Sequence, residues 1–533
     1  QNKKESTFYF HTTSTTSSSN YMLIKVFSAT LQGLKALPVT IEVNATVGLK
    51  FVMVGLPDNA VKESHERILS ALEVSGYRLP ARHIVVNMAP ADIKKEGSGF
   101  DLPLAIGILA SAEKIKTDRL NRFMLVGELG LDGNIQPIKG ILPLAIKAKE
   151  LGYEGIFVPA QNANEAAVVE GLDVYGAEKL SDVADFFNTN KELPKTKVDI
   201  KEQFYFGQNN FDVDFEDVKG QENVKRAFEV AAAGGHNIIL IGSPGCGKSM
   251  MAKRLPSILP PLSIAESLET TQIHSVAGKL SNGSSLISQR PFRSPHHTIS
   301  DAALVGGGNT FMPGEICLAH NGVLFLDELP EFSRSVLETL RQPLEDRIIT
   351  ISRARYSFTL PCSFMLVASM NPCPCGYHHH PTRQCMCSPG QIQRYMNKIS
   401  GPLMDRIDIQ VEVQSVPFEE IADAPKGEPS SVIRQRVIKA RKIQEERFAG
   451  LDGIYCNAQM NSSLLRKYSV PSENGNKMLR TAMNRLNLSA RAYDRILKVA
   501  RTIADLDGSE NIQDNHIAEA IGYRNLDRET WYE

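Results

Sequence analysis

The sequence predicts an α/β multidomain protein that ends in a helical domain. In residues 22–187, β-rich runs such as VTIEVNATV and HIVVNMAP alternate with amphipathic runs such as NAVKESHERILSALEVSG. In residues 211–415, strand-like and helical runs alternate around a glycine-rich loop, which is typical of a parallel sheet with helices on its faces. From residue 416 to residue 533 helical periodicity dominates, so we expect an α-helical domain there.

Composition and charge narrow the class of protein. With 533 residues, of which 42% are hydrophobic and 22% charged, the chain is long enough for several soluble domains. A formal net charge of −1 excludes an overall polycation, so any contact with nucleic acid must come from local patches. Eight cysteines are too few for a disulfide scaffold and favour a reduced, cytoplasmic protein. No apolar run approaches the ~20 residues of a membrane helix, so no membrane partner is expected.

Three stretches differ in composition from the domains around them. Residues 1–21 are rich in serine and threonine and are predicted to be a disordered leader. Residues 188–210, NTNKELPKTKVDIKEQFYFGQNN, are polar and are predicted to link the first domain to the second. A cysteine-rich insert occupies residues 373–387, inside the second domain.

The strongest motif is a phosphate loop, IILIGSPGCGKS, in which an apolar strand runs into glycines and then into a helical segment. Glycines let backbone N–H groups approach phosphates, and the following helix adds the positive end of its dipole. We expect Lys248 to reach the β- and γ-phosphates of ATP and Ser249 to bind Mg²⁺. The alternative is a chance glycine loop. The predicted nucleotide-binding residues are Gly242, Ser243, Pro244, Gly245, Cys246, Gly247, Lys248 and Ser249.

Two further strands supply polar groups at their ends. The run GVLFLDE (322–328) predicts a buried strand that ends in Asp327, a second Mg²⁺ ligand, and Glu328, which would orient or polarise the attacking water. An exposed acidic pair is the alternative. The run SFMLVASMN (363–371) predicts another strand, and Asn371 at its end would contact the γ-phosphate or the water.

Two arginines extend this pattern, Arg406 in SGPLMDRIDIQVEV and Arg491 in LSARAYDRILKVARTIAD. With Asn371, these segments resemble the AAA+ ATPases. The resemblance implies that Asn371 is the sensor-1 residue and that Arg491 is the sensor-2 residue of the lid. It also implies that Arg406 is an arginine finger for the neighbouring subunit's nucleotide, as in the magnesium-chelatase and MCM-helicase branch. The alternatives are an ion pair of Arg406 with Asp405 or Asp408, and an ordinary surface charge at position 491.

Longer strings are more specific. FRSPHHTISDAALVGGGNTFMPGEICLAHNGVLFLDELPEF (292–332) and LRQPLEDRIITISRARYSFTLP (340–361) closely resemble the ComM/YifB family of bacterial magnesium-chelatase-like ATPases. The resemblance covers nearly all of residues 22–530. It implies a homo-hexameric ring that moves along single-stranded and branched DNA, with branch migration in homologous recombination and natural transformation as its role. Recombination proteins would be its partners.

A candidate DNA contact lies in ITISRARYSFTLP (349–361), which predicts a β-hairpin with Arg353 and Arg355 at its tip. The hairpin resembles the one that MCM helicases project into their central channel. Arginines there suit phosphate contact, and Tyr356 suits stacking on a base. The alternative is a solvated hairpin tip.

The glycine-rich run at 305–309 lies where related ATPases place a loop that faces the central pore. A plain flexible loop is an equal alternative. For His296 and His297 we expect a packing or interface role.

The first domain resembles the proteolytic domain of Lon in IKKEGSGFDLPLAIGILAS (93–111) and in residues 125–152. Lon uses a serine–lysine dyad, but here the nucleophile position falls at Gly99 and the lysine position near Leu142. We therefore predict a Lon-type fold without peptidase activity, used for ring assembly or as an additional DNA surface. A shifted dyad of Ser98 and Lys139 is the alternative.

The insert CPCGYHHHPTRQCMC contains two C-x-C pairs, and four thiolates suit tetrahedral Zn²⁺. The predicted ligands are Cys373, Cys375, Cys385 and Cys387. A histidine of the run 378–380 is a substitute ligand, and free thiols or an iron–sulfur cluster are the alternatives. The insert follows Asn371 and leads toward Arg406. We therefore expect a structural zinc that shapes the loop between these two residues.

Three hypotheses for function follow. The first is an ATP-driven DNA motor, in which Lys248, Asp327 and Glu328 carry hydrolysis. The second is a magnesium-chelatase-type remodeller whose client is a protein, and the third, the least favoured, is an ATP-dependent serine–lysine protease. The arginine-bearing hairpin separates the first two, because a protein remodeller has no need of a phosphate contact there.

Overall fold

The computed structural model describes residues 23–78, 82–189, 192–280, 285–308, 311–353, 356–378, 380–414, 426–451, 453–486 and 488–524. The expected leader lies outside these residues. The chain divides into two compact units near residue 197, with the short segments 32–35 and 139–143 grouped with the second unit. Each unit is considered by itself.

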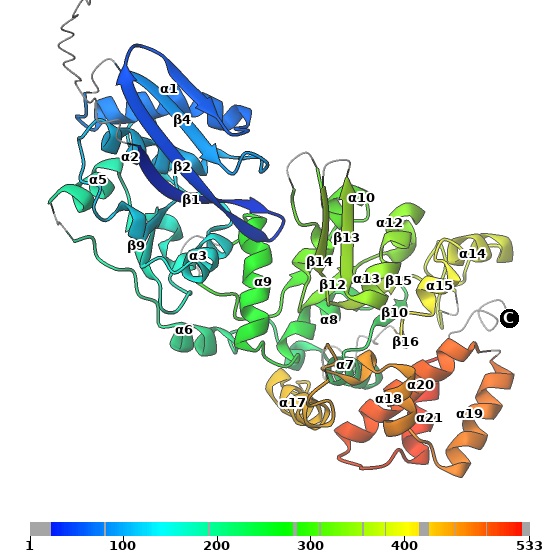
Figure 1. Cartoon of the computed structure of the whole chain (residues 1–533). Helices are drawn as coiled ribbons and strands as arrows, with labels where there is room; N and C mark the ends of the chain where they lie inside the picture. The colour runs from blue at the N-terminus through cyan, green and yellow to red at the C-terminus, as the bar shows by residue number, and fades with distance from the viewer. Residues whose placement is uncertain are drawn as a thin grey trace, which may run out of the picture. The chain divides into compact units, whose positions relative to one another are not determined.

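The first unit is built on a seven-stranded mixed sheet in the order β3-β4-β2-β1-β5-β8-β9 (Figure 1). β2 pairs antiparallel with β4, whereas β3–β4, β1–β5, β5–β8 and β8–β9 are parallel. Its elements are β1 (Ile24–Gln32), β2 (Lys35–Val47), β3 (Phe51–Val54), α1 (Asn59–Val74), β4 (Arg82–Ala89), α2 (Asp101–Ser111), β5 (Phe123–Leu125), β6 (Glu128–Leu129), β7 (Ile135–Gln136), α3 (Ile141–Glu150), β8 (Gly155–Pro159), α4 (Ala163–Ala166), β9 (Asp173–Ala177) and α5 (Leu180–Thr189).

The core of the first unit forms around α2, whose eleven residues are all buried. This helix is apolar on every side, so it must be enclosed. A Cβ on Gly107 would lie 2.8 Å from a methyl carbon of Val43, so the absent side chain lets α2 pack closely on β2. The elements of this unit therefore pack as helices around one twisted sheet.

The second unit contains a five-stranded parallel sheet in the order β11-β12-β15-β10-β16. Its elements as far as the end of this sheet are α6 (Ile200–Gly207), α7 (Glu222–Gly234), β10 (Ile238–Gly242), α8 (Lys248–Arg254), α9 (Ile264–Val276), β11 (Phe292–Arg293), α10 (Asp301–Val305), α11 (Glu315–Leu318), β12 (Val323–Leu326), α12 (Arg334–Thr339), α13 (Arg341–Asp346), β13 (Ile348–Arg353), β14 (Tyr356–Pro361), β15 (Met365–Met370), α14 (Pro389–Met396), α15 (Gly401–Met404) and β16 (Ile409–Val413).

Both faces of this sheet are buried, which explains why its strands read as continuous apolar runs. Ile238 and Leu240 of β10 belong to a core that includes α7 and the C-terminal helices. Ile239 and Ile241 belong to the core on the opposite face, with residues of α9 and α11. Because all five strands are parallel, the loops after them leave from one edge of the sheet, where ligands bind in such folds.

The C-terminal helices form a bundle that we call the lid, residues 426–524 (Figure 1). α7 packs against α17 and α20, so the lid continues the core on one face of the sheet. Its helices are α17 (Ser430–Arg447), α18 (Ser462–Tyr468), α19 (Glu473–Arg485), α20 (Ala490–Leu506) and α21 (Asp514–Gly522).

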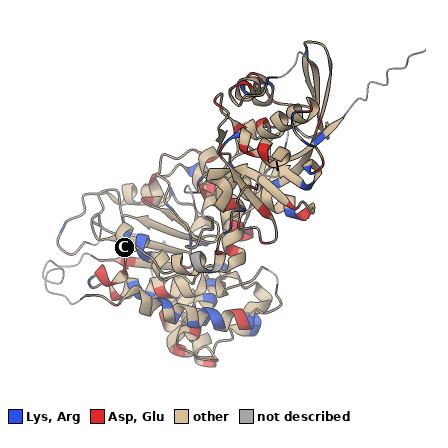
Figure 2. Ribbon diagram, turned by 90° about the vertical axis from the view of Figure 1, so that its left-hand side faces the viewer, with Lys and Arg blue, Asp and Glu red and all other residues tan. Residues whose placement is uncertain are grey.

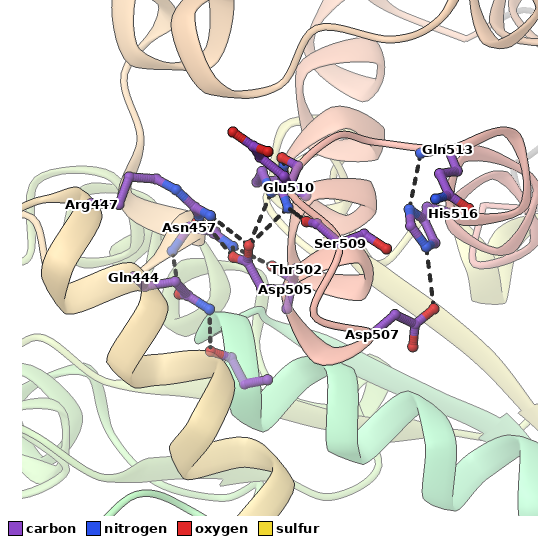
Figure 3. A network of polar contacts seen from close by, with 12 residues as sticks. Gln444, Arg447, Asn457, Thr502, Asp505, Asp507, Ser509, Glu510, Gln513 and His516 are labelled. Atoms are coloured by element: carbon purple, nitrogen blue, oxygen red, sulfur yellow. Dashed lines mark hydrogen bonds and ion pairs between the residues drawn. The ribbon is translucent and has the colours of Figure 1, made fainter.

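A buried polar network holds the lid helices together (Figure 3). Asp505, whose side chain has no exposed area, accepts hydrogen bonds from Arg447 at 2.7 and 2.5 Å and from Asn457 Nδ2 at 2.7 Å. Arg501 donates to the same carboxylate at 3.1 Å and to the backbone oxygens of residues 509 and 510. One carboxylate thus neutralises two guanidinium groups that are largely withdrawn from water.

The boundary between the two units, near residue 197, falls within the expected linker at 188–210. The second half of this segment contains α6, where Phe204 is 2% exposed. Gln289 donates a hydrogen bond to the backbone oxygen of Gly207, and Gln208 donates to that of Leu262. Within the aromatic run FYF only Phe204 is buried, whereas Tyr205 and Phe206 are exposed. None of the helices in the described residues has both the length and the apolar character required to cross a membrane.

Candidate nucleotide site

The order of the sheet brings the predicted nucleotide residues together. β15 lies between β12 and β10, so the ends of these three strands are neighbours. Lys248, the first residue of α8, donates to the backbone oxygens of Gly242 at 2.6 Å and Ser243 at 2.9 Å, and to Asn371 Oδ1 at 3.2 Å. Lys248 and Asn371, which are 123 residues apart in the sequence, therefore meet at one point.

The glycines of the phosphate loop are required by its geometry. A Cβ on Gly242 would lie 2.3 Å from the backbone oxygen of Val413, closer than any side chain permits. Gly245 and Gly247 have φ values of +81° and +89°, which residues with a side chain rarely adopt. The loop thus keeps a compact path at the N-terminus of α8, where backbone N–H groups favour an anion.

Asp327 is oriented by two serines. Ser249 Oγ donates to Asp327 Oδ2 at 2.6 Å, and Ser369 Oγ donates to Asp327 Oδ1. Oxygens of Ser249 and Asp327 are the hard ligands that Mg²⁺ prefers, so this pair fits the predicted metal position. Ser369 was not predicted from the sequence, because a serine inside an apolar strand gives no sign of its partner on the neighbouring strand.

Glu328 follows directly and has a φ of +54°, in the left-handed region. Its backbone N–H lies 3.2 Å from Asp327 Oδ1 and 3.3 Å from Ser369 Oγ. The side chain is exposed, and His297 Nδ1 lies 3.8 Å from its Oε2. His296 and His297 lie in the loop after β11, with ring centroids 4.1 Å apart, so they form one packed pair.

Arg406 has a partner that the sequence did not indicate. Arg406 is 8% exposed, donates to the backbone oxygen of Pro402 at 2.7 Å, and forms an ion pair with Glu345 of α13. The hydrogen bond from Arg406, followed by the charges of Arg406 and Arg491, lowers the pKa of Glu345. Arg491 is exposed in the first turn of α20.

An ion pair of Arg406 with Asp408 was one alternative to the role of arginine finger. The structure shows instead that Asp408 is paired with other residues. Arg495 lies 2.9 Å from Asp408 Oδ1, and His236 Nδ1 lies 3.1 Å from Oδ2. Burial opposes ionisation of Asp408, but the charges of Arg495 and His236 outweigh it and lower its pKa. His236 also contacts Thr502 Oγ1 at 2.8 Å, so this buried group connects the beginnings of β10 and β16 to the lid.

The four predicted cysteines converge. Their sulfur atoms all lie within 4.8 Å of one another. The Sγ of Cys373 is 3.3 Å from that of Cys375 and 3.7 Å from that of Cys385, and the Cys375 and Cys385 sulfurs are 3.5 Å apart. Four Zn–S bonds of ~2.3 Å at tetrahedral angles would place the sulfurs ~3.8 Å apart. The donor set therefore fits one tetrahedral metal ion.

The surroundings of Cys375 also suit a metal-binding thiolate. Burial opposes ionisation, but backbone hydrogen bonds from Tyr377 and Met386 outweigh it and lower the pKa of Cys375 to about 6. Gly376, at a φ of +82°, lies so close to the phosphate loop that a Cβ would be 2.5 Å from Cδ of Pro244. The cysteine cluster thus packs on the phosphate loop as well as following Asn371.

The structure confirms the hairpin of β13 and β14, which pair antiparallel with Ile348 opposite Pro361 and Arg353 opposite Tyr356. Arg355 at the tip lies outside the described residues. For Arg353 and Tyr356 the structure describes the backbone alone. The register nonetheless places Arg353 and Tyr356 opposite each other at the far end of the hairpin. The other end of the hairpin is connected to α13 and β15.

At the Lon-like positions the structure describes the surroundings of Ser98, Gly99 and Leu142. Ser98 Oγ donates to Glu128, an acid, and Leu142 at the lysine position is fully buried. Gly99, at the nucleophile position, has Ile138 Cδ1 3.2 Å from where its Cβ would be. The described partner of Ser98 Oγ is thus a carboxylate, which differs from the lysine of a serine–lysine dyad.

Three family profiles match the chain in succession. They are subunit ChlI of Mg-chelatase at residues 41–162, magnesium chelatase subunit ChlI at 214–421, and its C-terminal part at 427–524. Competence protein ComM of Haemophilus influenzae is 44% identical over 94% of this chain and 97% of its own length. The chain belongs to the ComM/YifB family of magnesium-chelatase-like AAA+ proteins.

Membership of the ComM/YifB family agrees with the geometry of the site. The protein YifB of Salmonella typhimurium is 42% identical over 93% of the chain and 96% of its own length. Lon protease 2 of Bacillus subtilis is 27% identical over 125 residues, which cover 23% of the chain. The fold is thus a Lon-like α/β domain, an AAA+ core with a parallel sheet and a helical lid. ATP and Mg²⁺ are the ligands that such a core implies.

Proposed function

We propose that the chain is an ATP-hydrolysing motor that acts on single-stranded and branched DNA as a homo-hexameric ring. The observation that supports this proposal is the β13–β14 hairpin, which lies in the chain between α13 and β15, the strand that leads to Asn371, and which has Arg353 opposite Tyr356 at its far end. Because β14 is followed within four residues by β15, a DNA contact at the hairpin would lie close in the chain to the strand that leads to Asn371.

Each residue of the site has a separate role in ATP hydrolysis. Lys248 binds the β- and γ-phosphates, and Ser249 and Asp327 hold Mg²⁺. Glu328 accepts a proton from the attacking water, while Asn371, 3.2 Å from Lys248, reports the state of the γ-phosphate. These roles need no movement of the sheet, because the strand ends already bring the groups together.

Arg406 and Arg491 connect this chemistry to the ring and to the lid. In the single chain Arg406 is paired with Glu345, and in the ring the neighbour's γ-phosphate would replace this carboxylate as its partner. Arg491 stands at the start of α20, the helix that also carries Thr502 and Asp505. Movement of Arg491 toward a nucleotide would therefore carry the whole lid with it.

The lid supplies further positive charge for a DNA backbone. Lysine and arginine occur at many positions of its helices, as the blue segments of Figure 2 show. The exposed ones include Lys439, Lys442, Arg466, Lys467, Lys477, Arg480 and Arg485. Such contacts do not depend on the DNA sequence, which suits a motor that moves along DNA.

The relative ComM is named a competence protein. We extend that role to this chain and propose that it carries out branch migration during recombination and natural transformation, with recombination proteins as partners.

The double variant Arg353→Ala/Arg355→Ala tests the hairpin. We expect loss of most of the DNA-stimulated ATPase rate. The slope of log K against log salt for single-stranded DNA should also fall by about 1.4, the value for two lost phosphate contacts. The variant Lys114→Ala/Lys116→Ala removes the same charge from exposed positions of the Lon-like domain and is the control. DNA stimulation and salt dependence that stay as in the wild type would rule the hairpin out as the DNA contact.

A protein remodeller is the alternative function, favoured by the matches to magnesium chelatase subunits. It shares the hydrolysis site but needs no phosphate contact at the hairpin. Wild-type ATPase that does not respond to single-stranded, duplex or forked DNA, and that does respond to a protein client, would favour this alternative.

We also propose that Cys373, Cys375, Cys385 and Cys387 hold a structural Zn²⁺. The ion would link the loop after Asn371 into one rigid unit and so fix Gly376 against Pro244 of the phosphate loop. A metal bound by four thiolates adds no chemistry to hydrolysis, because it has no open coordination position. Its contribution is to the shape of the loop between Asn371 and Arg406.

Elemental analysis of the purified chain tests this proposal, and we expect about one zinc atom per chain. Cys385→Ser should lose the metal, lower the melting temperature and weaken the binding of a fluorescent ATP analogue, because the loop behind Pro244 loses its cross-link. Cys456→Ala, at a cysteine outside the cluster, should keep the metal. Protein made in zinc-supplemented medium that contains no zinc would refute the proposal.

A further inference from the structure

Basic side chains of the lid and of the core gather where strands of the parallel sheet begin. We call Arg347, Arg441, Arg495 and Lys498 the basic cluster. Arg441 belongs to α17, Arg495 and Lys498 belong to α20, and Arg347 lies directly before β13. Arg495 contacts Asp408, the residue before β16, which pairs in parallel with β10. The five residues of β10 separate this end of the sheet from the phosphate loop, a distance of ~16 Å.

Two of the lid cations lie near Cys456, beside the C-terminal end of α7. Arg441 Nη2 donates to the backbone oxygen of Ala232 at 3.3 Å. A Cβ on Gly235 would lie 3.2 Å from the same nitrogen and 2.8 Å from Cys456 Sγ. Lys498 Nζ donates at 3.0 Å to the backbone oxygen of the second residue after Cys456. Arg441 and Lys498 thus approach one place from two different helices of the lid.

Arg347 joins this group from the core. Its backbone oxygen accepts a hydrogen bond from Cys362 N at 2.9 Å, ahead of β15. Burial lowers the pKa of Arg347, and the positive charges of Arg441 and Arg495 lower it further. Burial, followed by the charge of Arg495, lowers the pKa of Lys498 to about 8. The members of the basic cluster therefore lie close enough to repel one another.

Carboxylates near the basic cluster are already bound by other cations. Asp408 is bound by Arg495 at 2.9 Å, as described above. Glu266, which the charge of Arg441 also reaches, is bound through both of its oxygens by Arg290 at 3.2 Å. Neither carboxylate is therefore available as the counter-charge of Arg441.

Arg347 and Arg441 lack a counter-charge. In the part of the chain that the structure describes, neither forms an ion pair, and the Nε of Arg441 is buried without a hydrogen-bond partner. Asp494 acts on Lys498, but within the same described residues no ion pair joins the two. Both arginines are half-buried, which leaves access for a small ion. Cations withdrawn from water without a counter-charge are costly, so this arrangement indicates a place for an anion.

We propose that the basic cluster binds a phosphate group, supplied by inorganic phosphate or by a small phosphomonoester, and that this group ties the lid to the core. Two guanidinium groups without counter-charge match a phosphate, which carries close to two negative charges at neutral pH. The fork of a guanidinium also fits two phosphate oxygens at once. Because Arg441 belongs to the lid and Arg347 to the core, one phosphate bound by both would cross-link them. This site is independent of the proposed action on DNA.

Thermal unfolding of the full chain tests the proposal, with the phosphate loop filled by Mg²⁺ and a non-hydrolysable ATP analogue. Inorganic phosphate should raise the melting temperature by about 3 °C or more, because it binds the folded chain alone. Sodium chloride at the same ionic strength should not. Isothermal titration calorimetry with inorganic phosphate and with glycerol 3-phosphate then gives two Kd values, and the lower one identifies the source of the phosphate group.

Arg347→Gln and Arg441→Gln separate an anion site from a structural role. Each should weaken phosphate binding by about tenfold or more, because a charge-assisted contact is lost. Without phosphate, each should melt at or above the wild-type temperature, because the repulsion among the cations falls. Lys442→Gln, at the next and exposed position of α17, is the matched control and should keep the phosphate response. Arg441→Lys keeps the charge without the fork, so it should bind more weakly than the wild type and serves should Arg441→Gln not fold.

Two results would overturn the proposal. One is a wild-type melting temperature that phosphate leaves unchanged, or that sodium chloride raises equally, while the phosphate loop is filled. The other is wild-type affinity for phosphate in Arg347→Gln and in the folded variants of Arg441. Lower melting temperatures of the glutamine variants, with no phosphate bound by the wild type, would show that these arginines stabilise the fold and that no anion site exists.

Discussion

Glu328→Gln is expected to lower the rate of ATP hydrolysis by a factor of ~10² or more, while ATP binding persists. Glutamine has the size of glutamate but its amide cannot accept the proton of the attacking water. Lys248→Ala should instead weaken nucleotide binding itself, because Lys248 is the cation nearest to the loop carbonyls of Gly242 and Ser243. Single-turnover hydrolysis and the Kd of a fluorescent ATP analogue separate the two effects.

Glu331→Gln is the matched control for Glu328→Gln. Glu331 lies three residues later, is exposed, and pairs with Lys398 at 3.3 Å, away from Asp327 and Ser249. Its replacement should leave hydrolysis within a factor of about two, as for other solvent-exposed ion pairs. Hydrolysis by Glu328→Gln at the rate of Glu331→Gln would show that Glu328 does not act on the water.

Asp505→Ala is expected to cost about 3–5 kcal/mol of the stability of the lid, because it leaves the guanidinium groups of Arg447 and Arg501 buried without their counter-charge. The side chains of Arg447 and Arg501 are 12% and 3% exposed, so water cannot replace the lost carboxylate. Thermal and urea unfolding, followed by circular dichroism, measure this loss.

Asp507→Ala provides the comparison within the same helix end (Figure 3). Asp507 is 40% exposed and contacts His516 at 3.2 Å, so its loss should cost about 1 kcal/mol or less. Equal destabilisation by Asp505→Ala and Asp507→Ala would show that the buried network does not hold the lid. Gln444 of the lid also donates to the backbone oxygen of Ala233 in α7. Loss of the network should therefore also destabilise the packing of the lid against α7.

The parts of the site that are local in sequence were predicted well. The phosphate loop needs a strand, glycines at positive φ and a helix within twelve consecutive residues, and β10 ends at Gly242 and α8 begins at Lys248, as the motif predicts. The same holds for β12, which ends one residue before Asp327, and for the two C-x-C pairs, whose sulfurs converge. In each case the chemistry fixes both residue type and spacing.

The missed parts depend on contacts between distant segments. Arg406 pairs with Glu345, 61 residues away, and His236 contacts Asp408 and Thr502 at separations of 172 and 266 residues. No spacing rule in the sequence links such positions. Their pairing is set by the order of strands in the sheet and by the way the lid packs against α7. The contact between His297 and Glu328 was hidden for the same reason, since β11 and β12 become neighbours only in the folded sheet.

Unwinding of forked DNA by the full chain, with ATP and Mg²⁺, tests the central claim most directly. We predict that the wild type separates or migrates the branch only while it hydrolyses ATP, and that Glu328→Gln binds the same fork but does not unwind it. Unwinding by Glu328→Gln equal to that of the wild type, or hydrolysis by the wild type that no DNA accelerates and that moves no branch, would contradict the claim that this ATPase is a DNA motor.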